Sequence, residues 1–167
     1  MVGDTVQADI IVGDSTLPVD SLHGLAFTIL YDNALVDSAT ARIVFSDSWL
    51  GTTAQTLELQ YDRWEDGAID GAVTRRDGQN ASGYGVLGQL HIVLIDNIEG
   101  KRNLTEQLHV NVGFRTGITA SENLVTFADL GDSLAVNDPE NVVPPGQIPA
   151  ADIQLFPNPG NGHFDLR

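Results

Sequence analysis

The sequence has no cysteine and few basic residues, and these two shortages exclude several classes of function. Without cysteine there is no disulfide framework, no thiolate nucleophile and no cysteine-ligated zinc site. Only 8 Lys and Arg residues stand against 23 Asp and Glu residues, which leaves a net charge of −15. A protein that binds nucleic acid needs a basic surface to displace counterions from the phosphates. The composition therefore excludes a nucleic-acid partner and indicates an acidic surface on which copies of the protein repel one another.

Long apolar runs are also missing. Hydrophobic residues make up 42% of the 167 residues but are scattered along the chain, and no stretch approaches the ~18 uninterrupted apolar residues of a membrane span. The first residues, Met1-Val2-Gly3-Asp4, lack the basic head and apolar stretch of a signal peptide. We therefore expect no membrane span, and we expect the chain to be a module of a longer protein that begins just before a domain boundary.

Apolar residues instead recur at every second position. The clearest segments are 25–31, 57–61, 90–94 and 108–114. Alternation of this kind puts one face of a strand in a core and the other toward water, as in antiparallel sheets. Turn-forming pairs such as Asp66-Gly67 and Asp77-Gly78 separate the segments, and no segment shows a helical stripe. The sequence predicts an all-β protein, an antiparallel two-sheet β-sandwich.

The alternation stops near residue 137. Residues 138–150 (DPENVVPPGQIPA) contain four prolines and no alternation, which is typical of an extended linker. We therefore predict a sandwich over 1–137, a proline-rich linker over 138–150, and in 151–167 the truncated start of a further strand-like unit that is too short to form its own core.

Catalytic patterns are scarce. The motif Gly-x-Ser-x-Gly is absent and the four histidines are dispersed. His91 and His109 fall on the polar faces of their segments, and a metal between them would require those strands to be neighbours; the alternative is that both are solvated. Glu65 and Asp66 are an acid pair of the kind glycosidases use, but in a chain with 23 acids such pairs arise by chance. We expect no enzymatic activity.

Two further kinds of binding site have candidates. Asp77 and Asn80 offer the oxygen ligands that calcium prefers, although Asp, Asn and Gly are also the usual turn formers; we expect no other cofactor. Trp64 falls on the same side of its strand as Glu58 and Asp62, and an exposed Trp64 together with Tyr84 would offer flat rings to a polysaccharide. The alternative is that Trp64 covers the end of the core.

Four landmarks resemble, in order, those of cohesin-like domains. They are Gly3–Val6, Gly24–Asp32, Asp70–Arg75 and Gly83–Leu90. The resemblance implies a jelly-roll β-sandwich related to bacterial cellulose-binding modules, and a non-catalytic module for interaction, adhesion or scaffold assembly. The alternative is a carbohydrate-binding accessory module of a secreted polysaccharide-degrading system. A dockerin is one candidate partner, but no residue set selects it, and we favour another protein or a polysaccharide at the cell surface.

A second resemblance lies near the end of the chain. The stretch Leu155–Phe164 (LFPNPGNGHF) resembles the opening of the C-terminal sorting domain of the type IX secretion system of Bacteroidetes. Pro157, Asn158 and Pro159 would fix a turn, and Gly162 would complete a tight hairpin. The resemblance implies a protein exported by a Gram-negative bacterium, secreted or held at the cell surface.

Five short Asp-Ser or Asp-Thr motifs are similar to the O-glycosylation acceptor sequence of exported Bacteroidetes proteins. Their hydroxyl residues are Thr5, Ser15, Ser21, Ser38 and Ser133. Asp-Ser is also common in turns, where the side chain bonds to the backbone, so both interpretations stay open.

Overall fold

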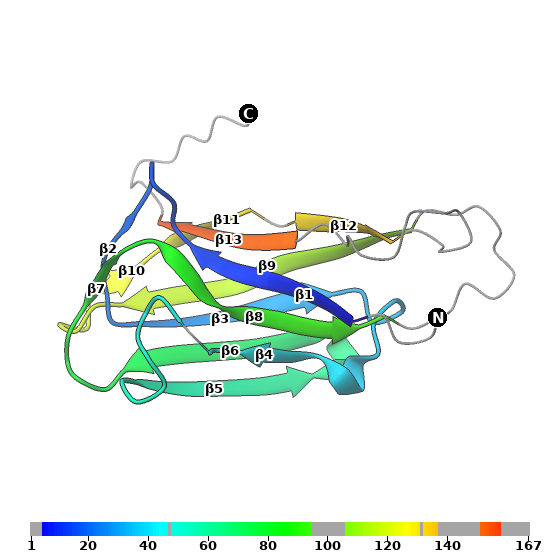
Figure 1. Ribbon diagram of the computed structural model, residues 1–167, viewed down its shortest axis with the longest axis horizontal. Coiled ribbons are helices and arrows are strands. Elements are labelled where there is room, and N and C mark those ends of the chain that lie inside the picture. Colours follow the sequence, from blue (N-terminus) through cyan, green and yellow to red (C-terminus); the bar gives the residue numbers. More distant parts are fainter. Residues whose placement is uncertain (1–4, 47, 95–105, 131, 137–150, 158–167) are drawn as a thin grey trace, which may run out of the picture.

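The computed structural model describes residues 5–46, 48–94, 106–130, 132–136 and 151–157. In these ranges the chain forms strands and two short 3₁₀ turns (Figure 1). The elements are β1 (Thr5–Val12), β2 (Val19–Leu22), β3 (Gly24–Tyr31), η1 (Ser38–Thr40), β4 (Arg42–Val44), β5 (Thr56–Arg63), η2 (Trp64–Asp66), β6 (Ala68–Arg75), β7 (Ala81–Gly83), β8 (Gly85–Val93), β9 (Glu106–Ile118), β10 (Leu124–Val125), β11 (Phe127–Leu130), β12 (Asp132–Val136) and β13 (Ala151–Pro157).

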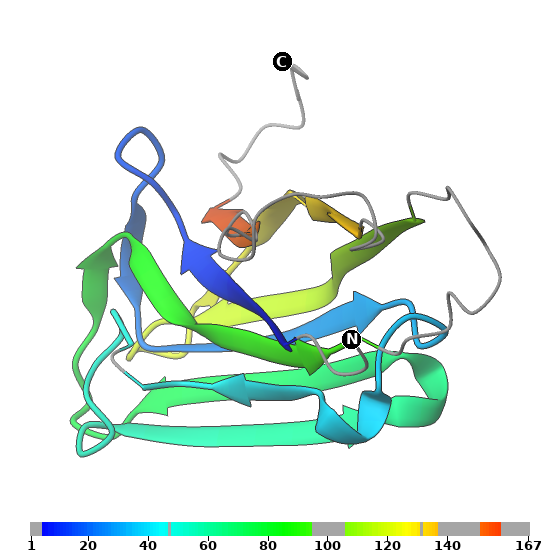
Figure 2. The same cartoon turned by 45° about the vertical axis from the view of Figure 1, so that its right-hand side comes forward.

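The strands form two main sheets. The five-stranded sheet has the order β11-β13-β1-β8-β4, and the six-stranded sheet has the order β10-β9-β3-β6-β5 with β12 also paired to β9. A separate ribbon of β2 and β7 lies at one end of the sandwich (Figure 2). The structure confirms the predicted all-β, mostly antiparallel two-sheet sandwich of jelly-roll type. In the described ranges no helix is long and apolar enough to cross a membrane.

The core lies between the inner faces of the two sheets. Alternate residues of β1, β3, β8 and β9 point into it, because a strand turns successive side chains to opposite faces. Phe27 and Phe45 meet edge to face, with ring centroids 6.4 Å apart. Gly71 leaves room for this contact, since a Cβ there would lie 2.8 Å from both Phe27 Cζ and Ile43 Cδ1. The sequence periodicity therefore identified the core-facing residues of the central strands.

The tail of the chain differs from the predicted organisation. We expected 151–167 to start a separate unit, but Ala151–Pro157 forms β13 within the five-stranded sheet. It pairs in parallel with β1 and antiparallel with β11. The physical reason is that Ala151 to Leu155 has the same alternation as a sandwich strand, and a linker sequence does not determine where the next strand pairs. Residues 137–150 and 158–167 lie outside the described part of the chain.

Candidate functional site

Strand β5 presents its apolar side chains to solvent, which is the reverse of the orientation that alternation predicts. Leu57, Leu59 and Tyr61 are 52%, 63% and 68% exposed. The register pairs these residues with Thr74, Ala72 and Asp70 of β6, on the outer face of the sheet. Exposed large apolar side chains gathered on one strand face are uncommon in a monomer and mark interaction surfaces. We therefore take this face as the candidate functional site.

The polar residues of β5 turn toward the opposite sheet and are used there. Gln60 Oε1 accepts a hydrogen bond of 2.8 Å from the backbone N–H of Ile43 in β4. Thr56 is buried and donates its hydroxyl hydrogen to Glu58 Oε1 at 2.8 Å. Both β5 and β4 are edge strands, and an edge strand has unpaired backbone groups on one side. Gln60, which faces inward at this edge, satisfies one such group.

Asp62, the last of these inward residues, meets Tyr31 at the end of β3. Asp62 Oδ1 and Tyr31 Oη are both buried, and neither has a hydrogen-bond partner among the described residues. Burial raises the pKa of Tyr31 to about 12, and the nearby Asp62 charge adds to this rise. Burial also raises the pKa of Asp62, and the Tyr31 hydroxyl opposes part of that increase. This corner of the sandwich is therefore electrostatically unfavourable for an ionised Asp62.

The outer face of the same sheet is hollowed into an open groove of about 200 Å³, which we call the sheet groove. Its lining residues are Gly24, Leu25, Ala26, Leu57, Leu59, Ala72, Val73, Thr74, Thr116 and Ile118. Within the groove the outward-facing residues of the central strands β3 and β6 are small, whereas β5 on one side carries leucines and β9 on the other carries Ile118. Small residues in the middle and larger ones at the sides produce a trough that runs along the strands.

The dimensions of the sheet groove suit a helix. Strands β5 and β9 are separated by β6 and β3, so their axes lie three inter-strand spacings apart, about 14 Å. An α-helix with its side chains is about 10–12 Å across. A helix laid along β3 and β6 would contact the small side chains below it and Leu57 and Leu59 beside it.

A polar network closes the groove face toward η2. Arg63 donates from Nε to Asp70 Oδ2 at 2.9 Å and from Nη2 to Asp70 Oδ1 at 3.2 Å. Thr28 donates its hydroxyl hydrogen to Asp70 Oδ1 at 2.6 Å. The Arg63 guanidinium, followed by the Thr28 hydroxyl, lowers the pKa of Asp70. Arg63 also pairs with Asp66, 3.2 Å away. This end of the face therefore presents fixed charges beside exposed Tyr61.

The two aromatic residues predicted to bind polysaccharide do not share a platform. Trp64 is 56% exposed at the start of η2, directly after β5, and Tyr84 is 51% exposed between β7 and β8. The end of β5 and the junction of β7 with β8 lie at opposite ends of the sandwich (Figure 1). Trp49 is partly buried and packs against the core.

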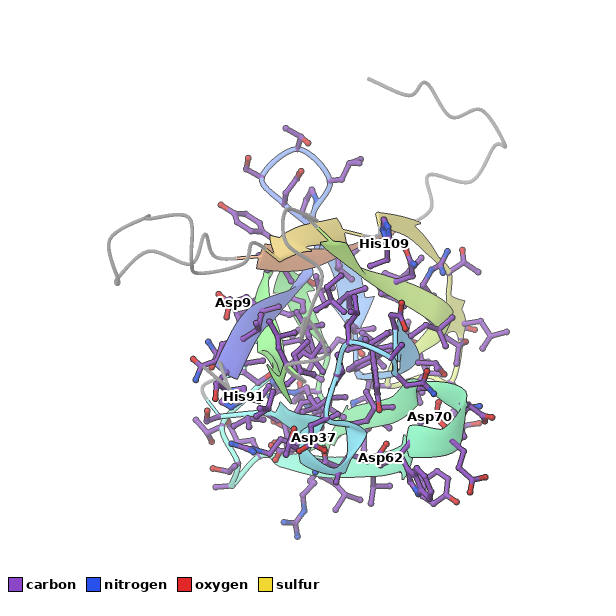
Figure 3. All side chains as sticks on the ribbon, turned by 90° about the vertical axis from the view of Figure 1, so that its right-hand side faces the viewer. Asp9, Asp37, Asp62, Asp70, His91 and His109 are labelled. Carbon is purple, nitrogen blue, oxygen red and sulfur yellow. The ribbon has the colours of Figure 1, made fainter. Side chains whose placement is uncertain are left out.

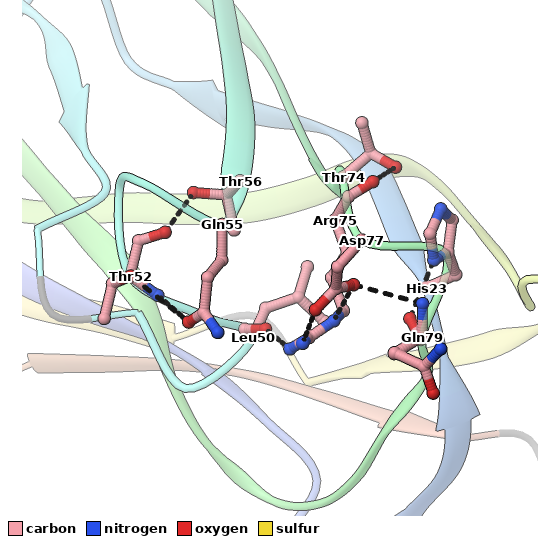
Figure 4. A network of polar contacts seen from close by, with 9 residues as sticks. All are labelled: His23, Leu50, Thr52, Gln55, Thr56, Thr74, Arg75, Asp77 and Gln79. Atoms are coloured by element: carbon pink, nitrogen blue, oxygen red, sulfur yellow. Dashed lines mark hydrogen bonds and ion pairs between the residues drawn. The ribbon is translucent and has the colours of Figure 1, made fainter.

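The predicted calcium ligands take part in turn contacts. Asp77 forms an ion pair with Arg75 through both carboxylate oxygens, and Asp77 Oδ1 also accepts from the backbone N–H of Gln79 at 3.0 Å (Figure 4). The bonds from Arg75 and then from Gln79 lower the pKa of Asp77. Asn80 Oδ1 accepts from the backbone N–H of Ala120 at 2.7 Å. Among the described residues no three His, Cys, Asp or Glu side chains gather as a metal site would require.

The two candidate histidines lie on different sheets. His91 is on β8 of the five-stranded sheet and His109 on β9 of the six-stranded sheet, well apart in Figure 3. Their strands are not neighbours, as a metal site between them would require, and alternation alone does not say to which sheet a strand belongs. Burial, and then the Arg42 charge, lowers the pKa of His91. The acid pair Glu65 and Asp66 is exposed in η2.

The remaining predicted residues are spread over the chain. Of the glycosylation candidates, Thr5 and Ser15 are exposed, and Ser21 is partly buried in β2. Ser38 lies in η1 and Ser133 in β12. Of the sorting-signal residues, Pro157 ends β13, and Asn158, Pro159 and Gly162 lie outside the described residues.

The residues that line the sheet groove were not singled out by sequence reasoning. A signal for them exists in the outward positions of β3 and β6, which hold Gly24, Ala26, Ala72 and Thr74. Four small residues on the solvent face of two paired central strands leave little side-chain volume there. A groove at this place can therefore be predicted from the sequence once the inward-facing positions are known.

Comparison with known proteins places the fold. No family model matches the sequence, and no curated protein matches it significantly. The structure is similar to a type II cohesin domain from the cellulosome of Acetivibrio cellulolyticus, with a TM-score of 0.55 and 10% identity over 74% of this chain and 79% of that chain. It is also similar to one chain in the structure of a type I cohesin–dockerin complex from Clostridium thermocellum, with a TM-score of 0.53 and 10% identity over 74% of this chain and 88% of that chain. The chain thus has the fold of a cohesin-like β-sandwich.

Proposed function

We propose that the protein is a non-catalytic protein-recognition module that binds an α-helix of a partner protein in the sheet groove. The observation that supports this most directly is the orientation of β5. This strand holds Leu57, Leu59 and Tyr61 toward the solvent, although the polar residues that alternate with them could have faced the solvent instead. Exposing these side chains leaves their apolar surface in water in the free protein, and a bound helix would cover it.

The chemistry of the partner follows from charge. The chain has a net charge of −15, so a partner helix with an apolar face flanked by Lys or Arg would be attracted to it, and one flanked by Asp or Glu would be repelled. The Arg63–Asp70 pair at the end of the groove is a fixed polar group that a helix side chain would meet.

The similar cohesin structures bear on the kind of partner. One of them is described as a cohesin–dockerin complex, so a dockerin is one helical partner to test, although no residue set in this chain selects it. Carbohydrate binding receives less support from the geometry, because Trp64 and Tyr84 lie at opposite ends of the sandwich. We further propose that the module belongs to an exported bacterial protein, as the stretch Leu155–Phe164 implies.

The experiment uses two amphipathic peptides of about 20 residues, each with leucines on one helical face. One carries lysines at the flanking positions and the other carries glutamates. We expect the lysine peptide to bind the full chain measurably in isothermal titration and the glutamate peptide to bind at least about tenfold more weakly.

Leu59→Asp places a charge on the groove wall and should weaken binding of the lysine peptide by about tenfold or more. Leu17→Asp is the matched control, since Leu17 is an exposed leucine in the turn after β1 that does not line the groove. Equal binding by wild type and Leu59→Asp would overturn the proposal, and so would equal affinity for the two peptides.

A further inference from the structure

A second interaction surface lies in the other sheet, where β13 fills the position between β1 and β11. Residues 151 to 155 pair with residues 8 to 12 of β1 in parallel, and residues 154 to 157 pair with residues 127 to 130 of β11 in antiparallel orientation. Within the described residues β11 has no other strand ladder, so it joins this sheet through β13.

Strand β13 shares one tripeptide with the strand beside it. Ala151-Asp152-Ile153 is identical to Ala8-Asp9-Ile10 in β1, and the register pairs the two tripeptides residue by residue. Ala8, Ile10 and Val12 of β1 are buried in the core. The edge of β1 therefore presents a well-defined position for a strand that starts with this pattern.

Strand β13 can leave this position without altering the pairing of β1 with β8 or of β8 with β4, although β11 then loses its ladder partner. It is the last described element, and 14 residues separate Val136 from Ala151. Those residues include Pro139, Pro144, Pro145 and Pro149, and proline cannot donate to a strand ladder. When β13 leaves, β1 exposes the unpaired backbone groups of an edge strand over residues 8–12, which is a template for a replacement strand.

We propose that the space between β1 and β11 is a strand-acceptor site, and that the protein's own segment Ala151–Pro157 occupies it as a separable ligand. The segment is favoured over a second copy because two chains that each carry a net charge of −15 repel one another. Tethering also gives the chain's own segment an effective concentration in the millimolar range.

The test uses the full chain with a sequence-specific protease site inserted between Asn141 and Val142. After cleavage we expect the C-terminal piece to co-elute with the body in gel filtration. A fluorescent peptide of sequence ADIQLFP, in excess, should then replace it with saturable binding that unlabelled peptide competes. When the C-terminal piece is washed away the melting temperature should fall, and added peptide should restore it.

Two variant peptides, each with one added negative charge, test whether the register is specific. Ile153→Asp alters the position paired with the fully buried Ile10, whereas Gln154→Asp alters the position paired with the partly exposed Ile11. We expect the first to compete at least about tenfold more weakly than the second. Release of the C-terminal piece with an unchanged melting temperature and no saturable peptide binding would overturn the proposal, as would equal competition by the two variants. Neither result tests helix binding in the sheet groove, because that groove lies on the other sheet.

Discussion

Replacing Asp62 with Asn should stabilise the protein at neutral pH. Asp62 Oδ1 is buried without a hydrogen-bond partner, next to Tyr31 Oη, which also lacks one. Burial raises the pKa of Asp62 above its ordinary value of 3.8, so the native state disfavours the ionised form. Asn keeps the shape, removes the charge and supplies an N–H that the Tyr31 oxygen can accept.

The pH dependence follows from the sign of that shift. A carboxyl whose folded pKa is raised holds its proton more tightly in the native state than in the unfolded chain. Wild-type stability therefore decreases as the pH rises from about 4 through the raised pKa of Asp62, and it is constant above that. Asp62→Asn has no such decrease, so its advantage should be small near pH 4 and largest at pH 7 to 8.

The magnitude at neutral pH is that of no longer burying an ionised acceptor without a partner, about 1 kcal/mol. For a domain of this size that corresponds to a rise in melting temperature of about 2–4 °C. Thermal unfolding followed by circular dichroism at constant ionic strength measures it. Asp66→Asn, at an exposed acid in the same corner, is the control and should give no such rise. An Asp62→Asn variant that melts at or below the wild-type temperature at pH 7, or whose difference is equally large at pH 4, would refute the reasoning.

Three further changes probe the fold and the site. Gln60→Leu removes the acceptor for the Ile43 N–H and should lower the free energy of unfolding by about 1 kcal/mol in urea titrations, whereas Gln60→Glu keeps an oxygen there and should cost less. Gly71→Ala places a methyl group 2.8 Å from Phe27 Cζ and should destabilise by about 1–3 kcal/mol, as a lowered urea midpoint would show. Asp70 has a lowered pKa, so its contribution to the free energy of unfolding is present above about pH 4 and is lost as the pH falls through the folded pKa. Asp70→Asn should therefore reduce the loss of stability in acid, by under about 1 kcal/mol because the Arg63–Asp70 pair is partly exposed.

The sequence was informative where burial decided the structure. In Leu25–Ile29 of β3 and Leu108–Val112 of β9 the alternate apolar residues are buried, because a central strand is paired along both edges and one of its two faces lies on the core. In β5 the same alternation misled, since Leu57, Leu59 and Tyr61 face outward. Alternation shows that the two faces of a strand differ but does not say which face is covered. At an edge strand the opposite sheet covers less of the inner face than it does at a central strand.

Long-range pairing was beyond the sequence for a different reason. The alternation of residues 151–155 identified a strand, but its pairing with β1 depends on an edge that exists only once β1 and β8 have folded together. His91 and His109 show the same limit, because assigning a strand to a sheet requires the topology of the whole sandwich. Contacts far apart in sequence were therefore the part that local patterns left open.

The sheet groove at β5 and the position beside β1 suit different partners, because β5 opposes pairing with a further strand and β1 favours it. β5 is an eight-residue edge, yet its inward-facing Glu58 and Asp62 carry charge, and inward charges at an edge oppose pairing with a further strand. A partner at β5 must therefore dock on the outer face, where Leu57 and Leu59 stand, and a helix does this because its own backbone groups are already satisfied. At β1 the inward residues are apolar and an incoming strand gains both backbone bonds and core contacts. Side-chain chemistry thus selects a helix for the sheet groove and a strand for the position beside β1.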